Sequence, residues 1–216
     1  QVRHVVVAAG AQRRPDLRLS GGDAEHGLAH LDTGLLYRAV GLAVRGHVEA
    51  PDFEARAIAA ARALDAAHLT DIGELTGAEA GMLASRVAVI ADVRIAMRQY
   101  QRDFAHQPGG AVLDGRDIGT VVCPDADVKL FIVADSKARM ERRARQLEAK
   151  GEVVDRYALY HQIEERDARD MANPNGGFYK APDAVLLDTT QLGIEAALRA
   201  AVAIVDQVMA EKAQGD

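Results

Sequence analysis

The chain has 216 residues, of which 49% are hydrophobic and 27% charged, and its net charge at pH 7 is −6. This is the composition of one globular domain with a full core, and it predicts no nucleic-acid and no membrane partner, although local arginines still suffice to bind small anions. A single cysteine, Cys123, excludes an internal disulfide, gives no metal-site signature and, with no secretory signal pattern visible, favours a cytoplasmic location.

Short apolar runs alternate with helical patterns along the chain, which is typical of an α/β fold. In chain order we expect strands at 4–9 and 28–31, helices at 33–48, 52–67 and 92–106, strands at 111–114 and 128–134, helices at 136–151 and 156–171, a strand at 184–188 and a helix at 192–213. The fold class predicted from this order is a parallel sheet with helices on both faces. Three residues mark helix ends: Asp52 and Ser136 as caps, and Gly151 at a C-terminus.

Polar side chains follow two of the predicted strands. The strand at 28–31 is followed by Asp32, Thr33, Tyr37 and Arg38, and the strand at 111–114 ends in Asp114 and is followed by Arg116 and Asp117. Since ligands of parallel sheets bind at the carboxyl ends of strands, both groups should face one crevice.

A third polar cluster lies on the predicted helix at 156–171. Arg166, Arg169 and Asp170 fall at i, i+3 and i+4, so we expect them to share one helix face. Arginines that neutralise a moving phosphoryl group, with carboxylates that hold a base, a hydroxyl or a metal, suit phosphoryl transfer. Each signal alone also fits a simpler explanation: a solvated helix face, a turn at Asp114, or an ordinary helical serine at Ser85.

The order of the motifs resembles that of bacterial cytidylate kinases, which are nucleoside monophosphate kinases. The motifs are "LDTGLLYRAV", "ASRVAVIADVR", "LDGRDIGTVVCPDADVKLF", "RDARD" and "APDAVLLDTT", over about residues 28–205. The resemblance implies a P-loop NTPase-like nucleoside monophosphate kinase fold. It further implies a single kinase domain over 1–216, with a small nucleotide-binding region at about 34–90 and a helical lid at about 145–180.

The resemblance also implies roles for the polar residues. Ser85, Arg94 and Asp117 would read cytosine, which presents an amino donor to a carboxylate or hydroxyl and acceptors to an arginine. Asp32, Thr33, Tyr37, Arg38 and Arg116 would contact the monophosphate and its sugar, and Arg166, Arg169 and Asp170 would belong to the lid. The implied catalytic residues are Arg116, Asp117, Arg166 and Arg169.

The implied reaction is transfer of the γ-phosphate of ATP to CMP or dCMP, giving ADP and CDP or dCDP, in pyrimidine nucleotide metabolism. Its cofactor would be Mg²⁺ carried with ATP, and the protein would act as a monomer. Positioning and electrostatics suffice for such a transfer without a covalent intermediate. An alternative from another class is a catalytically inactive relic that binds cytidine nucleotides.

The opening segment departs from the family pattern, which has a GxxxxGK[ST]-type loop that cradles the ATP phosphates. This chain reads "AAGAQRRPDLRLSGG" there; the position of the Walker A lysine falls near Pro15, and the first lysine is Lys129. Gly10 is the one residue assigned to ATP binding in this degenerate loop. A second departure is Asn173, which stands where the family usually has a lid arginine, with Lys180 or Arg169 as candidate replacements.

Three interpretations of the opening segment stay open. One arginine among Arg13, Arg14 and Arg18 replaces the lysine charge, although Arg is a larger planar fork and Pro15 lacks a backbone N–H. Alternatively, the segment has decayed. In the third interpretation, two compensating frameshifts replaced the true segment, which explains why the length is retained while the chemistry is lost.

The frameshift interpretation predicts that an alternative reading frame of codons 8–27 encodes a Gly-rich loop with Gly-Lys-Ser/Thr. Sequencing of the coding DNA checks this directly. If neither alternative frame encodes such a loop, the frameshift interpretation is wrong, and substitution or decay remains.

Overall fold

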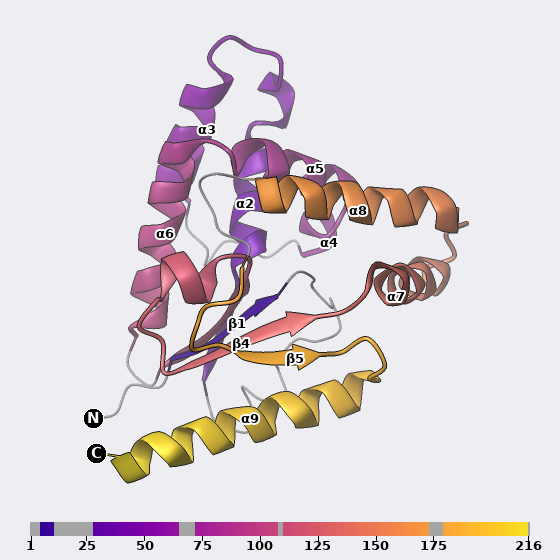
Figure 1. The fold of residues 1–216 in the computed structure, drawn as a ribbon. Helices are drawn as coiled ribbons and strands as arrows, with labels where there is room; N and C mark the ends of the chain where they lie inside the picture. Colours follow the sequence, from indigo (N-terminus) through magenta and orange to yellow (C-terminus); the bar gives the residue numbers. More distant parts are fainter. Residues whose placement is uncertain (1–4, 11–27, 65–71, 108–109, 173–178, 216) are drawn as a thin grey trace. The chain divides into compact units, whose positions relative to one another are not determined.

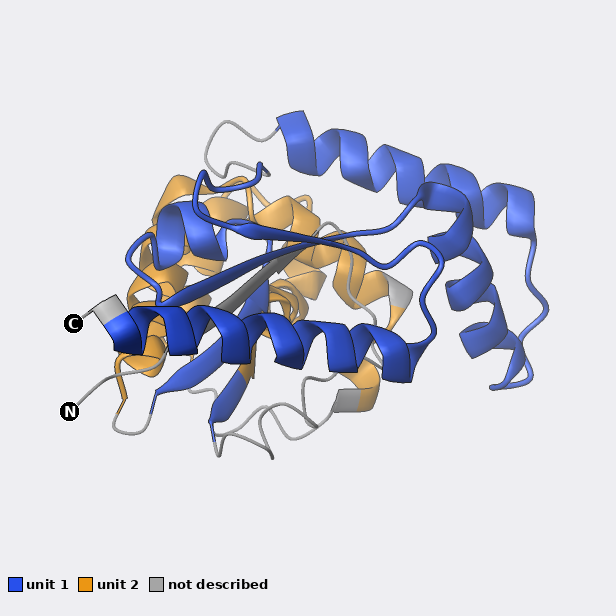
Figure 2. Ribbon diagram, turned by 60° about the horizontal axis from the view of Figure 1, so that its bottom comes forward, with its two compact units in different colours: residues 1–30, 109–216 blue, residues 31–108 orange. Residues whose placement is uncertain are grey.

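The structure, a computed structural model, describes residues 5–10, 28–64, 72–107, 110–172 and 179–215. It forms two compact units, one of residues 1–30 and 109–216 and one of residues 31–108 (Figure 2). The expected nucleotide-binding region at about 34–90 falls within the second unit, and the expected lid at about 145–180 within the first. Arg13, Arg14, Pro15, Arg18 and Asn173 lie outside the described residues.

The first unit is built on a parallel sheet (Figure 1). Its strands in the described residues are β1 Val5–Gly10, β2 Ala29–Asp32, β3 Ala111–Gly115, β4 Val128–Val133 and β5 Val185–Asp188, in the order β2-β3-β1-β4-β5. β1 pairs in parallel with β3 and β4, and β4 pairs in parallel with β5. The predicted α/β fold class with a parallel sheet is therefore confirmed.

The strand order locates the switch point of the sheet. β1 connects toward β2 on one side, whereas the chain after β3 crosses β1 to reach β4 on the other side. The two neighbouring strands β1 and β3 thus send their connections in opposite directions, and the switch point lies between them. Ala9 is in register with Gly115 there, so Gly10 and Arg116 both lie at the carboxyl edge of the switch point.

One face of the sheet is covered by the long helix α9, Ile194–Gly215 (Figure 1). Val128 and Leu130 of β4 are buried in the same apolar cluster as Ala201 and Val205 of α9. Because successive side chains of a strand point to opposite faces, Lys129 lies on the other face of β4. This alternation positions a charged residue inside the first unit.

Two further helices of the first unit, α7 Ser136–Glu148 and α8 Arg156–Ala172, pack on each other. The N-cap of α7 is Asp135, whose carboxylate accepts from the backbone N–H of Ala138, and not Ser136 as expected. The side chain of Ser136 instead accepts from Arg139 at 2.8 Å. The expected glycine end is confirmed: Gly151 has φ +82°, and two backbone bonds around it form a Schellman motif.

The second unit is helical in its described residues. Its helices are α2 Thr33–Ala43, α3 Phe53–Arg62, α4 Ile72–Leu75, α5 Ala78–Val87 and α6 Ala91–Ala105, with a short 3₁₀ turn, η1, at Arg45–His47. Asp52 precedes α3 as expected, but its side chain makes no cap bond and binds Arg56 at 2.9 Å. None of the described helices is both long and apolar enough to cross a membrane.

The close approach of α2 to α5 depends on a glycine. A Cβ added at Gly41 would lie 2.7 Å from Cβ and 2.8 Å from the carbonyl carbon of Leu83. Part of this contact is backbone, so the two helices would have to separate to relieve it.

We therefore expect Gly41→Ala to lower the free energy of unfolding by about 1–3 kcal/mol, because overpacking outweighs the gain in helix propensity. Urea unfolding of the full chain measures it. Gly46→Ala is the matched control in the same unit, since a Cβ there would meet no described atom within 4 Å. Equal stability of the two variants would contradict the close packing of α2 on α5.

Candidate active site

The carboxyl ends of β2 and β3 carry a polar pair in the first unit. Nε2 of His30 lies 2.8 Å from Oδ2 of Asp114, and both side chains are about three-quarters buried. His30 belongs to β2 and Asp114 to β3, so the pair lies beside the switch point between β1 and β3. The sequence indicated Asp114 through its motif, whereas nothing in the sequence marked His30 as its partner.

Arg116 and Asp117 lead from β3 into a wide helical turn, η3, at Ile118–Val122. The N–H of Val122 donates to the carbonyl of Asp117 at 3.2 Å, and the N–H of Cys123 donates to that of Ile118 at 2.7 Å. Both bonds span five residues, which is the pattern of a π-turn, a rare element often found at functional sites. Asp117 is only 9% exposed at the start of this turn.

The partly buried side of α8 carries other residues than the helix face that the sequence predicted. Arg166, Asp167 and Asp170 are partly buried, whereas Arg169 is exposed, and its Nε donates to the carbonyl of Glu165 in its own helix at 3.3 Å. A helix turns by about 100° per residue, so residues 163, 166, 167 and 170 lie on one side of α8. Residue 169 lies more than a quarter turn from the middle of that side. The expected face of Arg166, Arg169 and Asp170 is thus corrected to one of Arg166, Asp167 and Asp170.

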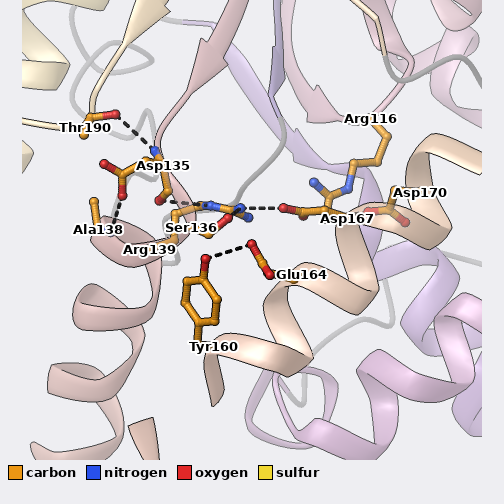
Figure 3. A network of polar contacts seen from close by, with 10 residues as sticks. All are labelled: Arg116, Asp135, Ser136, Ala138, Arg139, Tyr160, Glu164, Asp167, Asp170 and Thr190. Carbon is orange, nitrogen blue, oxygen red and sulfur yellow. Dashed lines mark hydrogen bonds and ion pairs between the residues drawn. The ribbon is translucent and has the colours of Figure 1, made fainter. Parts of the chain in front are cut away.

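Two ion pairs connect α8 to the rest of the first unit (Figure 3). Nη2 of Arg116 lies 3.1 Å from Oδ2 of Asp170, with both side chains about three-quarters buried. The second pair joins Arg139 of α7 to Asp167, with side chains 8% and 16% exposed. Two neighbouring acids of α8 are therefore held by arginines from two different segments.

Arg139 is held at two of its three guanidinium nitrogens. Nε donates to the carbonyl of Asp135 at 3.3 Å, and Nη2 donates to Oγ of Ser136 and to Asp167 (Figure 3). Asp135 in turn donates its N–H to Oγ1 of Thr190 at 3.1 Å, beyond the end of β5. Arg139 and Asp167 were not among the predicted site residues, because the sequence "SKARMERRARQLEAK" has the charge of an ordinary solvated helix. Only burial distinguishes Arg139 from its neighbours.

In the second unit, the segment "DTGLLYR" forms the start of α2. Asp32 caps the helix by accepting from the N–H of Gly34 at 3.1 Å, and Thr33 is buried. Arg38 donates from Nη1 to the carbonyls of Leu75 at 2.9 Å and Gly77 at 3.1 Å. Thr33, Tyr37 and Arg38 thus belong to α2, as expected, and Asp32 caps it. The guanidinium of Arg38 is directed to the segment between α4 and α5.

Ser85 and Arg94 also lie in the second unit. Oγ of Ser85 donates to the carbonyl of Gly81 at 3.2 Å, one turn back along α5. Arg94 is 8% exposed on the buried side of α6, beside Val93 and Met97. Gln101 and Ala105 are buried on the same side of α6. The buried side of α6 therefore carries two polar side chains, an arginine and a glutamine, beside its apolar ones.

The residues expected to read cytosine are thus divided between the two units. Ser85 and Arg94 belong to the second unit, and Asp117 belongs to the first. Within the first unit the structure brings together Arg116 and Asp170, with Arg166 on the same side of α8. Lys180, a candidate replacement for the lid arginine, donates to the carbonyl of Ala184 at 2.7 Å, before β5.

No group of three or more His, Cys, Asp or Glu side chains in the described residues could hold a metal ion by itself. Asp114 offers one carboxylate at the sheet edge. This donor set fits a magnesium ion that arrives with phosphate ligands of its own, because Mg²⁺ at such sites keeps only one or two protein carboxylates.

Comparison with known proteins finds one family. The model of the cytidylate kinase family matches residues 23–207. The chain is 49% identical over 185 residues to the cytidylate kinase of Methylocella silvestris, over 85% of this chain and 84% of the relative. It is 51% identical over 183 residues to that of Xanthobacter autotrophicus, over 85% and 87%. The family match begins at residue 23, near the end of the unusual opening segment.

The buried pair of Arg139 and Asp167 should contribute strongly to the docking of α8 on α7. We expect Asp167→Asn to lower the free energy of unfolding by about 3 kcal/mol, because it leaves the arginine charge buried without its counter-ion. Urea unfolding measures the loss, and hydrogen exchange shows whether it is concentrated in α8.

The matched control is Glu148→Gln, which removes an exposed pair between the same two helices: Glu148 and Arg156 lie 2.8 Å apart. Exposed pairs contribute little, so this variant should unfold like the parent chain. A loss in the control as large as that in Asp167→Asn would show that burial of the pair is not what matters.

Proposed function

The chain belongs to the cytidylate kinase family, and we propose on this premise that it transfers the γ-phosphoryl group of ATP to CMP or dCMP. The observation that carries the proposal is the match over residues 23–207, with about half of the positions identical in curated cytidylate kinases. The chain is therefore a phosphotransferase of pyrimidine nucleotide metabolism. Nothing in the comparisons favours an inactive relic.

In this reaction a phosphate oxygen of CMP attacks the γ-phosphorus of ATP, and the bond from that phosphorus to the β-bridging oxygen breaks, so ADP leaves. Arg116 suits a contact to the acceptor phosphate, since it follows β3 at the switch point and is held by Asp170. Arg166 lies on the same side of α8 and suits neutralisation of the moving phosphoryl group. Arg169 is exposed, so its catalytic role requires a rotation of its side chain toward the phosphates.

Base reading is assigned to Ser85, Arg94 and Asp117. Two of the three are almost fully buried, and a buried arginine and a buried carboxylate recognise a polar base edge better than exposed ones. Asp32, Thr33, Tyr37 and Arg38 complete the acceptor site at the start of α2.

Magnesium bound with ATP would neutralise charge on the phosphates. We assign its protein contact to Asp114, because the Asp114 carboxylate lies at the carboxyl edge beside β1 and contacts His30 at 2.8 Å. The ATP phosphates belong at Gly10 and the segment after it, where β1 ends. Action as a monomer and a cytoplasmic location remain predictions.

We expect the full chain to release ADP from ATP and Mg²⁺ in the presence of CMP or dCMP, faster than with UMP or AMP. A coupled assay for ADP measures turnover, and calorimetric titration measures CMP binding. CMP binding without ADP release would contradict the transfer, and equal turnover of CMP, UMP and AMP would contradict the base assignment.

We further expect Arg94→Met to lower kcat/KM for CMP by about ten- to a hundredfold, the value of one or two lost polar contacts to a base. Arg86→Met is the matched control, since Arg86 pairs with Glu49 on the surface of the same unit. The proposal requires the control to keep the activity of the parent chain.

A further inference from the structure

Lys129 of β4 has no role in the reaction described so far, yet it is 6% exposed. A lysine buried to this degree needs partners that compensate for the loss of water around its ammonium group. It lies on the face of β4 opposite the apolar cluster with α9, so it does not belong to that core.

The ammonium group of Lys129 joins two other segments to β4. Nζ donates to the carbonyl of Pro124, two residues after η3, and to Oδ2 of Asp183 at 2.7 Å, in the turn before β5. That turn is closed by a bond from the N–H of Ala184 to the carbonyl of Ala181 at 3.0 Å. One side chain therefore fixes the exit of η3 to a strand and to a closed turn.

The stem of Lys129 also contacts η3. A Cβ added at Gly119, inside the turn, would lie 3.3 Å from Cδ and 3.5 Å from Cγ of Lys129. The methylene groups thus run along the turn at a distance that only a glycine admits without displacement. Lys129 holds η3 along its side as well as at its exit.

The element η3 also fixes the backbone of Asp117. The carbonyl of Asp117 accepts from the N–H groups of Thr120, Val121 and Val122 at 3.3, 2.8 and 3.2 Å. A rotation of the turn would carry this carbonyl with it and re-aim the adjacent side chains of Asp117 and Arg116. The direction of both side chains therefore depends on what holds η3.

We propose that Lys129 is a positioning residue for the acceptor site: by holding η3 it aims Asp117 at the base and Arg116 at the phosphate. The inference rests on the proposed roles of those two residues. The hydrogen bond from Lys129 lowers the pKa of the Asp183 carboxyl below its ordinary value, so the carboxylate that accepts this bond persists to lower pH. Its stabilising contribution is present above the ordinary pKa of 3.8 and is lost as the pH falls through the lowered value.

The test is calorimetric binding of CMP and UMP, which needs no turnover and is therefore independent of the transfer step. We expect Lys129→Met, which keeps the stem and removes the ammonium, to weaken CMP binding by about ten- to a hundredfold and to reduce the preference for CMP over UMP. Lys212→Met is the matched control, since Lys212 also pairs with an aspartate of the first unit, Asp127 at 3.4 Å, on the surface. It should leave both affinities unchanged.

A double-mutant cycle separates positioning from general support of the fold. If Lys129 acts through Asp117, then Lys129→Met should cause no further loss of the CMP preference in an Asp117→Asn background. Asp183→Asn and Gly119→Ala disturb the same contacts more mildly and should shift the preference in the same direction. If Lys129→Met does not fold, the CMP preference of these two milder variants tests the positioning role of Lys129.

Lower thermal stability with an unchanged CMP preference in these variants would overturn the inference and leave Lys129 a structural residue. If Lys129→Met lowers the preference in the Asp117→Asn background by the same factor as in the parent chain, the inference is overturned as well. If Asp117→Asn itself leaves the preference unchanged, the base assignment fails and the inference with it. If the parent chain binds CMP selectively without releasing ADP, the proposed transfer fails while the role of Lys129 is still decided by binding.

Discussion

The parallel pairing of β1 with β3 decides where the polar groups of the first unit lie. The two strands are neighbours, but their connections leave in opposite directions, so the switch point at which parallel sheets bind ligands lies between their carboxyl ends. Gly10 ends one strand, and Asp114 to Asp117 end the other. The position of these residues at one edge of the sheet follows from this one arrangement of two strands.

The polar groups at this edge are held by charge pairs of unequal burial. Arg116 and Asp170 are partly exposed, whereas Arg139 and Asp167 are nearly covered. A partly exposed pair can exchange its partner for a phosphate at little cost, because water and the phosphate both compensate the charge. A buried pair cannot separate without leaving a charge unpaired in a medium of low dielectric constant. The two pairs thus suit different tasks: the pair of Arg116 and Asp170 can open, whereas the pair of Arg139 and Asp167 fixes α8 to α7.

The helix starts and the sheet could be read from the sequence because they depend on local chemistry. The run "HVVVAA" predicted a central strand, and β1 at Val5–Gly10 lies in the middle of the sheet, where both faces are covered in such folds. The cap of α7 was assigned one residue late, since Asp135 and Ser136 are both good caps and only the bond to Ala138 distinguishes them. The family membership followed from the order of motifs that each carry little information alone.

The sequence by itself determined the family and the α/β class, because motif order and hydrophobic periodicity are written along the chain. It also shows that "AAGAQRRPDLRLSGG" lacks the lysine of an ATP loop. Only the tertiary structure decided that Arg169 faces away from Asp170, that Arg139 is buried among charges, and that Lys129 holds the turn after Asp117. These three facts depend on which side of a helix or strand meets another segment, and burial of that kind is a property of packing between distant residues.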